Sequence, residues 1–168
     1  MYHVVCCTFF TVCVFFFFFA SSTRAVDIDN QLVQSGEGTP SILIASQDSD
    51  FKDAVVARIT STLDLLQLSY KVTEVSTLKK VDEDEWDAIV IVQTVKMGKI
   101  NKHVRRYLDN TLDLDKIVLV TTAGSGDPRT DAWDVDTITC ASKMEELENI
   151  LEQVLMRLEM IVGGSFST

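Results

Sequence analysis

Residues 41–62 read SILIASQDSDFKDAVVARITST and hold a strand, a turn and a helix in succession. The apolar run at 41–45 is typical of a strand buried on both faces. Apolar side chains then recur every fourth residue, which predicts an amphipathic helix. In an open parallel α/β sheet, a nucleotide phosphate would sit in the turn between them. Here that turn, SQDSD at 46–50, has no glycine and carries two carboxylates, so we interpret it as an altered phosphate site.

The alternation of strands and helices continues along the rest of the chain, which predicts a parallel sheet with right-handed crossovers. Only residues 76–87, which include the acidic run DEDE at 82–85, separate the second and third strands, so we expect a reduced crossover there. Further strands are expected at 68–72, 88–92, 117–120 and 135–139, and helical stripes at Phe51, Val55, Ile59 and Leu63, at Ile100, Val104, Leu108 and Leu112, and at Met144, Leu147, Leu151, Val154, Leu158 and Ile161.

The N-terminus differs from the rest of the chain, because residues 4–20 are almost wholly apolar. This run is slightly short for a membrane-spanning helix and is followed by small and polar residues, as in a secretory signal peptide. We therefore expect an exported protein, with an uncleaved N-terminal membrane anchor as the alternative. The expected organisation is a signal peptide at 1–25, a flexible leader at 26–40, one domain at 41–162 and a tail at 163–168.

Charge and cysteine content narrow the classes of partner. The net charge is −10 at pH 7, and no basic cluster offsets it, so binding to nucleic acid is not expected. Contact with a membrane is expected only through an uncleaved N-terminal segment. Cys6, Cys7 and Cys13 would leave with the signal peptide, and Cys140 alone cannot form an intrachain disulfide.

The segment Trp86–Asn110, WDAIVIVQTVKMGKINKHVRRYLDN, carries a family resemblance. Flavodoxins similarly have "YDAI" entering the third strand, then a loop, then a helix that ends near "FLD". Together with the order of elements over residues 41–161, the segment resembles the flavodoxin-like family. The resemblance implies a three-layer α/β fold with an open sheet of five parallel strands in the order 2-1-3-4-5.

The resemblance also implies FMN, whose phosphate would lie in the first turn. That turn lacks the family's glycine, and Asp48 and Asp50 would oppose a dianion. Residues 95–97 stand where an aromatic side chain usually stacks on the flavin. We therefore expect no resident cofactor, with FMN as the alternative. The candidate cofactor-binding residues at this edge are Ser46, Gln47, Ser49, Thr94, Thr122, Gly124, Ser125 and Gly126.

The loop TTAGSGDP at 121–128 follows the fourth strand of the predicted parallel sheet, at the face where such sheets bind ligands. Its glycines would let the backbone approach a ligand, but they also suit a plain turn. Trp133 could cap a ligand pocket or simply cover the end of the sheet.

Residues 136–142, DTITCAS, resemble the Asp-x-x-Ser/Thr-Gly-Ala-Thr/Ser sequence at which exported flavoproteins receive covalent FMN. The resemblance implies a phosphoester at Ser142. The alternative is a capping box, in which Ser142 and Glu145 open the last helix. Cys140 is either a reactive thiol near a helix N-terminus or a small buried hydrophobe.

No pattern identifies a catalytic or metal site. His103 has no partner at ligand spacing, and the acidic run at 82–85 is most simply a solvent-facing turn. Gly-x-Ser-x-Gly, Walker and His-Glu-x-x-His motifs are missing. We therefore expect a binding or interaction module without evident enzymatic activity, whose partner is a protein or a small ligand. The alternative is an FMN-carrying redox protein that holds flavin noncovalently or at Ser142.

Overall fold

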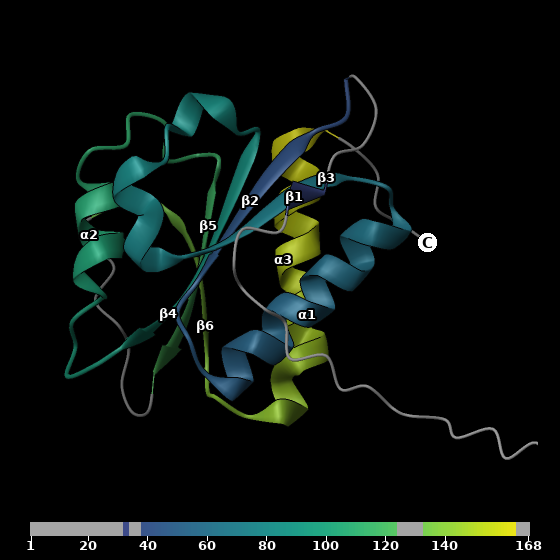
Figure 1. Cartoon of the computed structure of the whole chain (residues 1–168). Coiled ribbons are helices and arrows are strands. Elements are labelled where there is room, and N and C mark those ends of the chain that lie inside the picture. The colour runs from purple at the N-terminus through teal and green to yellow at the C-terminus, as the bar shows by residue number, and fades with distance from the viewer. Residues whose placement is uncertain (1–31, 34–37, 124–132, 164–168) are drawn as a thin grey trace, which may run out of the picture.

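One sheet organises the protein (Figure 1). The computed structural model describes residues 32–33, 38–123 and 133–163. The strand order is β1-β3-β2-β4-β5-β6; neighbours from β3 to β6 are parallel, and β1 is antiparallel to β3. The five parallel strands, numbered among themselves, have the predicted order 2-1-3-4-5. The strands are β1 (Leu32–Val33), β2 (Ser41–Ser46), β3 (Ser69–Glu74), β4 (Ala88–Val95), β5 (Ile117–Ala123) and β6 (Asp136–Cys140).

Helices cover both faces of the sheet, so the predicted three layers are confirmed. Figure 1 shows α1 and α3 together on one face and the shorter α2 on the other. Two apolar cores result, one between the sheet and α1 with α3, and one between the sheet and α2 with η1. The helices are α1 (Asp50–Leu65), α2 (Lys102–Leu108) and α3 (Leu147–Val162), and the 3-10 turns are η1 (Val75–Lys80), η2 (Glu83–Glu85) and η3 (Met144–Glu146).

The central strands β2, β4 and β5 are apolar at successive positions because both of their faces are buried. Ile42 and Ile44 face α1, whereas Leu43 and Ala45 face α2. Side chains alternate between the two faces of a strand, so only an unbroken apolar run satisfies both cores at once. The predicted buried strands are therefore confirmed.

The second crossover is reduced, as predicted. Between β3 and β4 the chain forms only η1 and η2, and Val75 and Leu78 are its buried apolar side chains. The α2 face is consequently covered by one seven-residue helix and a 3-10 turn, where a full crossover helix would otherwise pack.

Three local predictions about the helices are wrong. Met144 lies in η3, before α3 begins, and is 63% exposed, so it is not part of the apolar stripe. Leu112 is 95% exposed, because α2 ends at Leu108 and the chain turns there before the apolar stripe is complete. The capping box at Ser142 does not form, since Ser142 is exposed and α3 begins only at Leu147. Instead the Glu146 carboxylate accepts a hydrogen bond from the Ala141 backbone N–H at 3.0 Å.

The N-terminal predictions are largely untested by the fold. Strand β1 lies inside the segment expected to be a leader and pairs with β3, a feature the sequence pattern did not reveal. Residues 1–31 lie outside the described part of the chain, so the signal peptide and its cleavage stay predictions. Within the described ranges, no helix combines the length and the apolar character needed to cross a membrane.

Candidate functional site

The turn between β2 and α1 lies at the carboxyl edge of the sheet. Ser49 caps α1: its backbone is extended, and its hydroxyl accepts from the Lys52 backbone N–H at 3.3 Å. Serine suits this position because its short side chain reaches the unpaired N–H groups of the first helical turn. The predicted site residue Ser49 therefore serves the helix itself.

Lys52 is buried at this turn, with 5% of its surface exposed. Its Nζ donates to Ser49 Oγ at 2.7 Å and to Thr94 Oγ1 at 3.0 Å. The Thr94 hydroxyl in turn shares a hydrogen bond with the Thr122 hydroxyl at 3.0 Å. The structure thus joins three of the predicted residues in one network: Ser49, the cap of α1, and Thr94 of β4 bond to the ammonium group, and Thr122 of β5 bonds to Thr94.

Burial lowers the pKa of Lys52, because a charged ammonium loses hydration there. Sequence reasoning missed this residue. Lys52 lies four and seven residues before the buried Val56 and Ile59, so helical spacing places it on an inward face. The sequence signal that could have identified it is a lysine at helical spacing from the buried apolar residues of the same helix.

Gln47 fastens the same turn to β4. Its backbone N–H donates to the Val92 carbonyl at 3.0 Å, and its side-chain Oε1 accepts from the Thr94 N–H at 3.2 Å. Ser46 is fully buried, and its hydroxyl donates to the Gln47 carbonyl at 3.4 Å. These polar groups therefore bond to each other across the sheet edge, where a phosphate-binding turn would direct them toward a ligand.

Carboxylates give the N-terminus of α1 a negative surrounding. Asp50 and Asp53 lie in the first helical turn, with Asp48 just before it. Burial raises the pKa of Asp53, and the charges of Asp48 and Asp50 raise it further. The Asp53 Oδ1 atom is also buried without a hydrogen-bond partner in the described structure. These groups offset the positive helix end that would otherwise favour an anion.

The next turn at this edge projects outward. Lys96 and Lys99 exchange two backbone hydrogen bonds of 3.0 Å, which closes a two-residue hairpin. Met97 and Gly98 have φ angles of 53° and 71°, as the primed turns of such hairpins require. The Met97 side chain is 98% exposed. An apolar side chain flanked by two lysines therefore occupies the position at which flavodoxins usually have an aromatic side chain against the flavin.

The loop after β5 is described only in part. Thr122 is fully buried, and its hydroxyl also donates to the Gln93 carbonyl at 3.3 Å. Gly124, Ser125 and Gly126 lie outside the described residues. Trp133 packs against the core on the α2 face and donates from Nε1 to Asp109 Oδ1 at 3.1 Å, which favours its covering role.

Cys140 is a buried thiol. Its Sγ donates to the Thr121 carbonyl at 3.8 Å, and burial, with the charge of Glu146, raises the pKa of the thiol to about 11. The thiol is therefore protonated at neutral pH, which favours the buried-hydrophobe interpretation. His103 is partly buried at the start of α2. Where the structure describes the chain, no three His, Cys, Asp or Glu side chains are placed to bind a metal ion.

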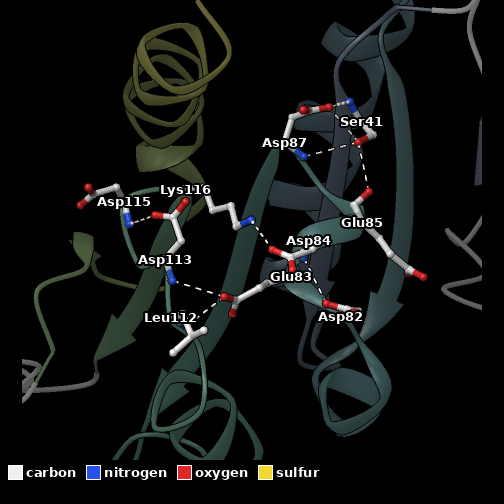
Figure 2. A network of polar contacts seen from close by, with 10 residues as sticks. All are labelled: Ser41, Asp82, Glu83, Asp84, Glu85, Asp87, Leu112, Asp113, Asp115 and Lys116. Carbon is white, nitrogen blue, oxygen red and sulfur yellow. Dashed lines mark hydrogen bonds and ion pairs between the residues drawn. The ribbon is translucent and has the colours of Figure 1, made fainter.

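The acidic run lies at the opposite, amino edge of the sheet and is more than a solvent-facing turn (Figure 2). Glu83 Oε1 accepts from the backbone N–H groups of Leu112 at 2.9 Å and Asp113 at 3.3 Å. Asp84 pairs with Lys116 at 4.0 Å. This run therefore connects η2 to the loop between α2 and β5.

Comparison with known proteins identifies the class of fold. No protein-family model matches the chain, and no curated protein matches it. A flavodoxin from the domain Archaea matches at a TM-score of 0.52 and 13% identity, over 72% of this chain and 98% of that one. Oxidised Flavodoxin 2 from Bacillus cereus matches at a TM-score of 0.52 and 13% sequence identity, over 71% of this chain and 98% of that one. The chain therefore has a flavodoxin-like fold, as its sequence predicted.

Proposed function

We propose that this chain is a non-enzymatic interaction module in which the flavodoxin-like phosphate turn is closed by the protein's own side chains. The observation that carries the proposal is the buried Lys52 ammonium, which bonds to Ser49 and Thr94. Hydroxyl groups that would face a phosphate are instead directed to an internal cation.

The groups at this turn do not fit FMN bound in the manner of a flavodoxin. Asp48, Asp50 and Asp53 would lie beside the phosphate dianion, and Gln47 already uses the N–H group of Thr94. Like charges at close range disfavour binding. No redox step is therefore assigned to this edge of the sheet.

The hairpin at 96–99 supports the interaction role. The two-residue turn fixes Met97 at a positive φ, so its side chain projects from a rigid hairpin. Met97 is held in this way and is almost fully exposed between two lysines. In a chain of net charge −10, this projecting turn offers a local positive and apolar contact for a partner.

A flavin titration tests the proposal. Free FMN is added to the unaltered protein and to the triple variant Asp48→Thr, Ser49→Gly, Asp50→Asn, and flavin fluorescence is followed. We expect no quenching by the unaltered protein and measurable quenching by the variant, because negative charge is removed and the turn is freed. Riboflavin is the control, since it lacks the phosphate and should not gain from the substitutions.

Tight binding of FMN by the unaltered protein would overturn the proposal and favour the redox alternative. Covalent flavin at Ser142 would do the same, and mass spectrometry of the intact protein would detect it as an added FMN mass that the Ser142→Ala variant lacks. A flat titration for both proteins would mean that the site has diverged beyond this turn, and would leave the interaction role in place.

A further inference from the structure

Basic side chains gather where β4 leads into α2. Residues 95–108 contain five lysine and arginine residues and no carboxylate, in a chain of net charge −10. All five are exposed, and within the described ranges only Arg105 has an ion-pair partner, Asp109. Together with the exposed Met97 they form a basic surface, which consists of Lys96, Met97, Lys99, Lys102, Arg105 and Arg106.

Two of these lysines face each other across the hairpin. Lys96 and Lys99 exchange both backbone hydrogen bonds, so their side chains leave the same side of the hairpin. Like charges directly opposite each other repel and destabilise such a pair. An anion placed beside both ammonium groups removes this repulsion, whereas an uncharged partner does not.

The basic surface is fixed to the sheet before a partner binds. Gln93 of β4 is fully buried, and its side-chain oxygen accepts from the Asn101 N–H at 2.9 Å, while the Asn101 side chain accepts from the His103 N–H at 2.8 Å. Figure 1 shows this segment running outward from the end of β4 and then back to α2. The basic residues of α2 recur three and four positions apart, so they share its exposed face. A surface fixed in this way loses little conformational entropy on binding.

We propose that the basic surface binds a short acidic segment of another polypeptide, with an apolar side chain of that segment against Met97. This assignment rests on the proposed interaction role and names the chemistry of the partner. Carboxylates of the segment lie against the lysines, which gives the contact its specificity. The flexible thioether side chain of Met97 adapts to an apolar neighbour and loses its exposure to water there.

Two observations favour a short segment over a nucleic acid or a membrane. The exposed residues of 95–108 include no aromatic side chain on which an unpaired base could stack, since Tyr107 is buried. The exposed carboxylates of Asp48 and Asp50 lie at the same carboxyl edge of the sheet. They repel any extended negative surface that reaches beyond the lysines, and a short segment avoids them.

The test uses the full chain and the blocked peptide acetyl-Asp-Glu-Leu-Glu-Asp-amide, with binding measured by calorimetric titration. The control peptide, acetyl-Asn-Gln-Leu-Gln-Asn-amide, replaces each carboxylate by an amide. We expect the acidic peptide to bind at least about tenfold more tightly than the control, and added salt to weaken it, because exposed charges are screened. No binding of the acidic peptide, or equal binding of both peptides, would overturn the proposal.

Substitutions locate the site. Lys99→Gln should weaken the acidic peptide several-fold, whereas the matched control Lys143→Gln should not, because Lys143 is an exposed lysine just before η3. Met97→Asn should also weaken it several-fold and keep the hairpin, since asparagine tolerates a positive φ. Met160→Asn is its control, because Met160 is 67% exposed on α3. Equal losses for a variant and its control would place binding elsewhere and overturn the proposal.

Other anions are further outcomes of the test. Vesicles of equal parts phosphatidylserine and phosphatidylcholine, and single-stranded oligothymidylate, are titrated in the same way. If either binds more tightly than the acidic peptide and is weakened by Lys99→Gln, the basic surface serves that anion and the proposal is overturned. The FMN titration reports on the turn at 46–50 instead, so a failure of peptide binding leaves the proposed function in place, whereas FMN binding by the unaltered protein overturns that function alone.

Discussion

At the scale of single residues, Lys52 decides which hydrogen bonds the hydroxyl groups at the carboxyl edge of the sheet make. A buried ammonium is costly unless it is hydrogen-bonded and near opposite charge. Here two hydroxyls accept from it, and Asp53 and Asp48 lie close enough to favour its charged form. The carboxylates that oppose a phosphate therefore stabilise an internal cation, and both features follow from the same cluster.

Cys140 provides a prediction at the same scale. In a chain with Cys6, Cys7 and Cys13 changed to serine, native Cys140 should react very slowly with Ellman's reagent at neutral pH and rapidly in denaturant. The thiolate is the reactive form, and burial raises the pKa of the thiol from 9.0 to about 11, so the rate should climb only as the pH approaches that value.

A neighbouring thiol is the control for this measurement. Thr139 is exposed on the same strand, so a Thr139→Cys, Cys140→Ser chain should react quickly in its native state. Equal rates for the two native proteins would contradict the burial of Cys140.

At the scale of elements, the acidic run at 82–85 holds the α2–β5 loop in the absence of a full crossover helix between β3 and β4. A crossover helix would hold the α2–β5 loop by packing, whereas here the Glu83 carboxylate accepts two backbone N–H groups of that loop. The other end of the segment is fastened by Asp87, whose carboxylate accepts from the Ser41 N–H at 2.7 Å (Figure 2). Polar bonds therefore replace part of the apolar contact that a longer crossover would supply.

Substitution of Glu83 tests this role. Glu83→Ala should lower the free energy of unfolding by about 1.5–3 kcal/mol, the usual net contribution of hydrogen bonds to a charged group. Chemical denaturation measures the change. Glu85→Ala is the control, because Glu85 lies in the same turn, its side chain is exposed, and the hydrogen bonds described for it use only its backbone N–H and carbonyl groups. If the free energy of unfolding changes equally in both variants, the contact of Glu83 with the loop does not contribute to stability.

At the scale of the whole molecule, two separate cores depend on one sheet. Each central strand contributes to both, so a defect in one strand weakens both layers. Ile91 is fully buried on the α2 face, opposite Leu119 of the adjacent strand. The α2 layer is thin, but the strand side chains that face it are as buried as those that face α1 and α3.

Ile91→Asp should therefore prevent cooperative folding. An unpaired buried charge costs several kcal/mol, which is comparable to the total stability of about 5–15 kcal/mol of an ordinary domain. Circular dichroism during heating should show no sharp transition. Leu65→Asp is the control, since Leu65 is 81% exposed and should tolerate the change. A soluble Ile91→Asp protein with a sharp melting transition would mean that the core is misplaced.

The amino-acid sequence by itself determined the class of fold, because hydrophobic periodicity reports burial along one element at a time. The apolar runs at 88–92 and 117–120 identified the central strands, and the short segment at 76–87 identified the reduced crossover. The same periodicity failed at Leu112, where the helix ends before the stripe does.

The contents of the candidate site were decided only by the tertiary structure. The contact of Lys52 with Thr94 spans 42 positions, that of Gln47 with Thr94 spans 47, and that of Glu83 with Leu112 spans 29. Which groups meet over such separations depends on how strands and helices pack, and no local pattern records it. The residues of the turn at 46–50 were thus enough to predict an altered phosphate site. The cation at this turn depends on tertiary packing, because Lys52 of α1 meets its partner Thr94 only at the ends of β4 and β5.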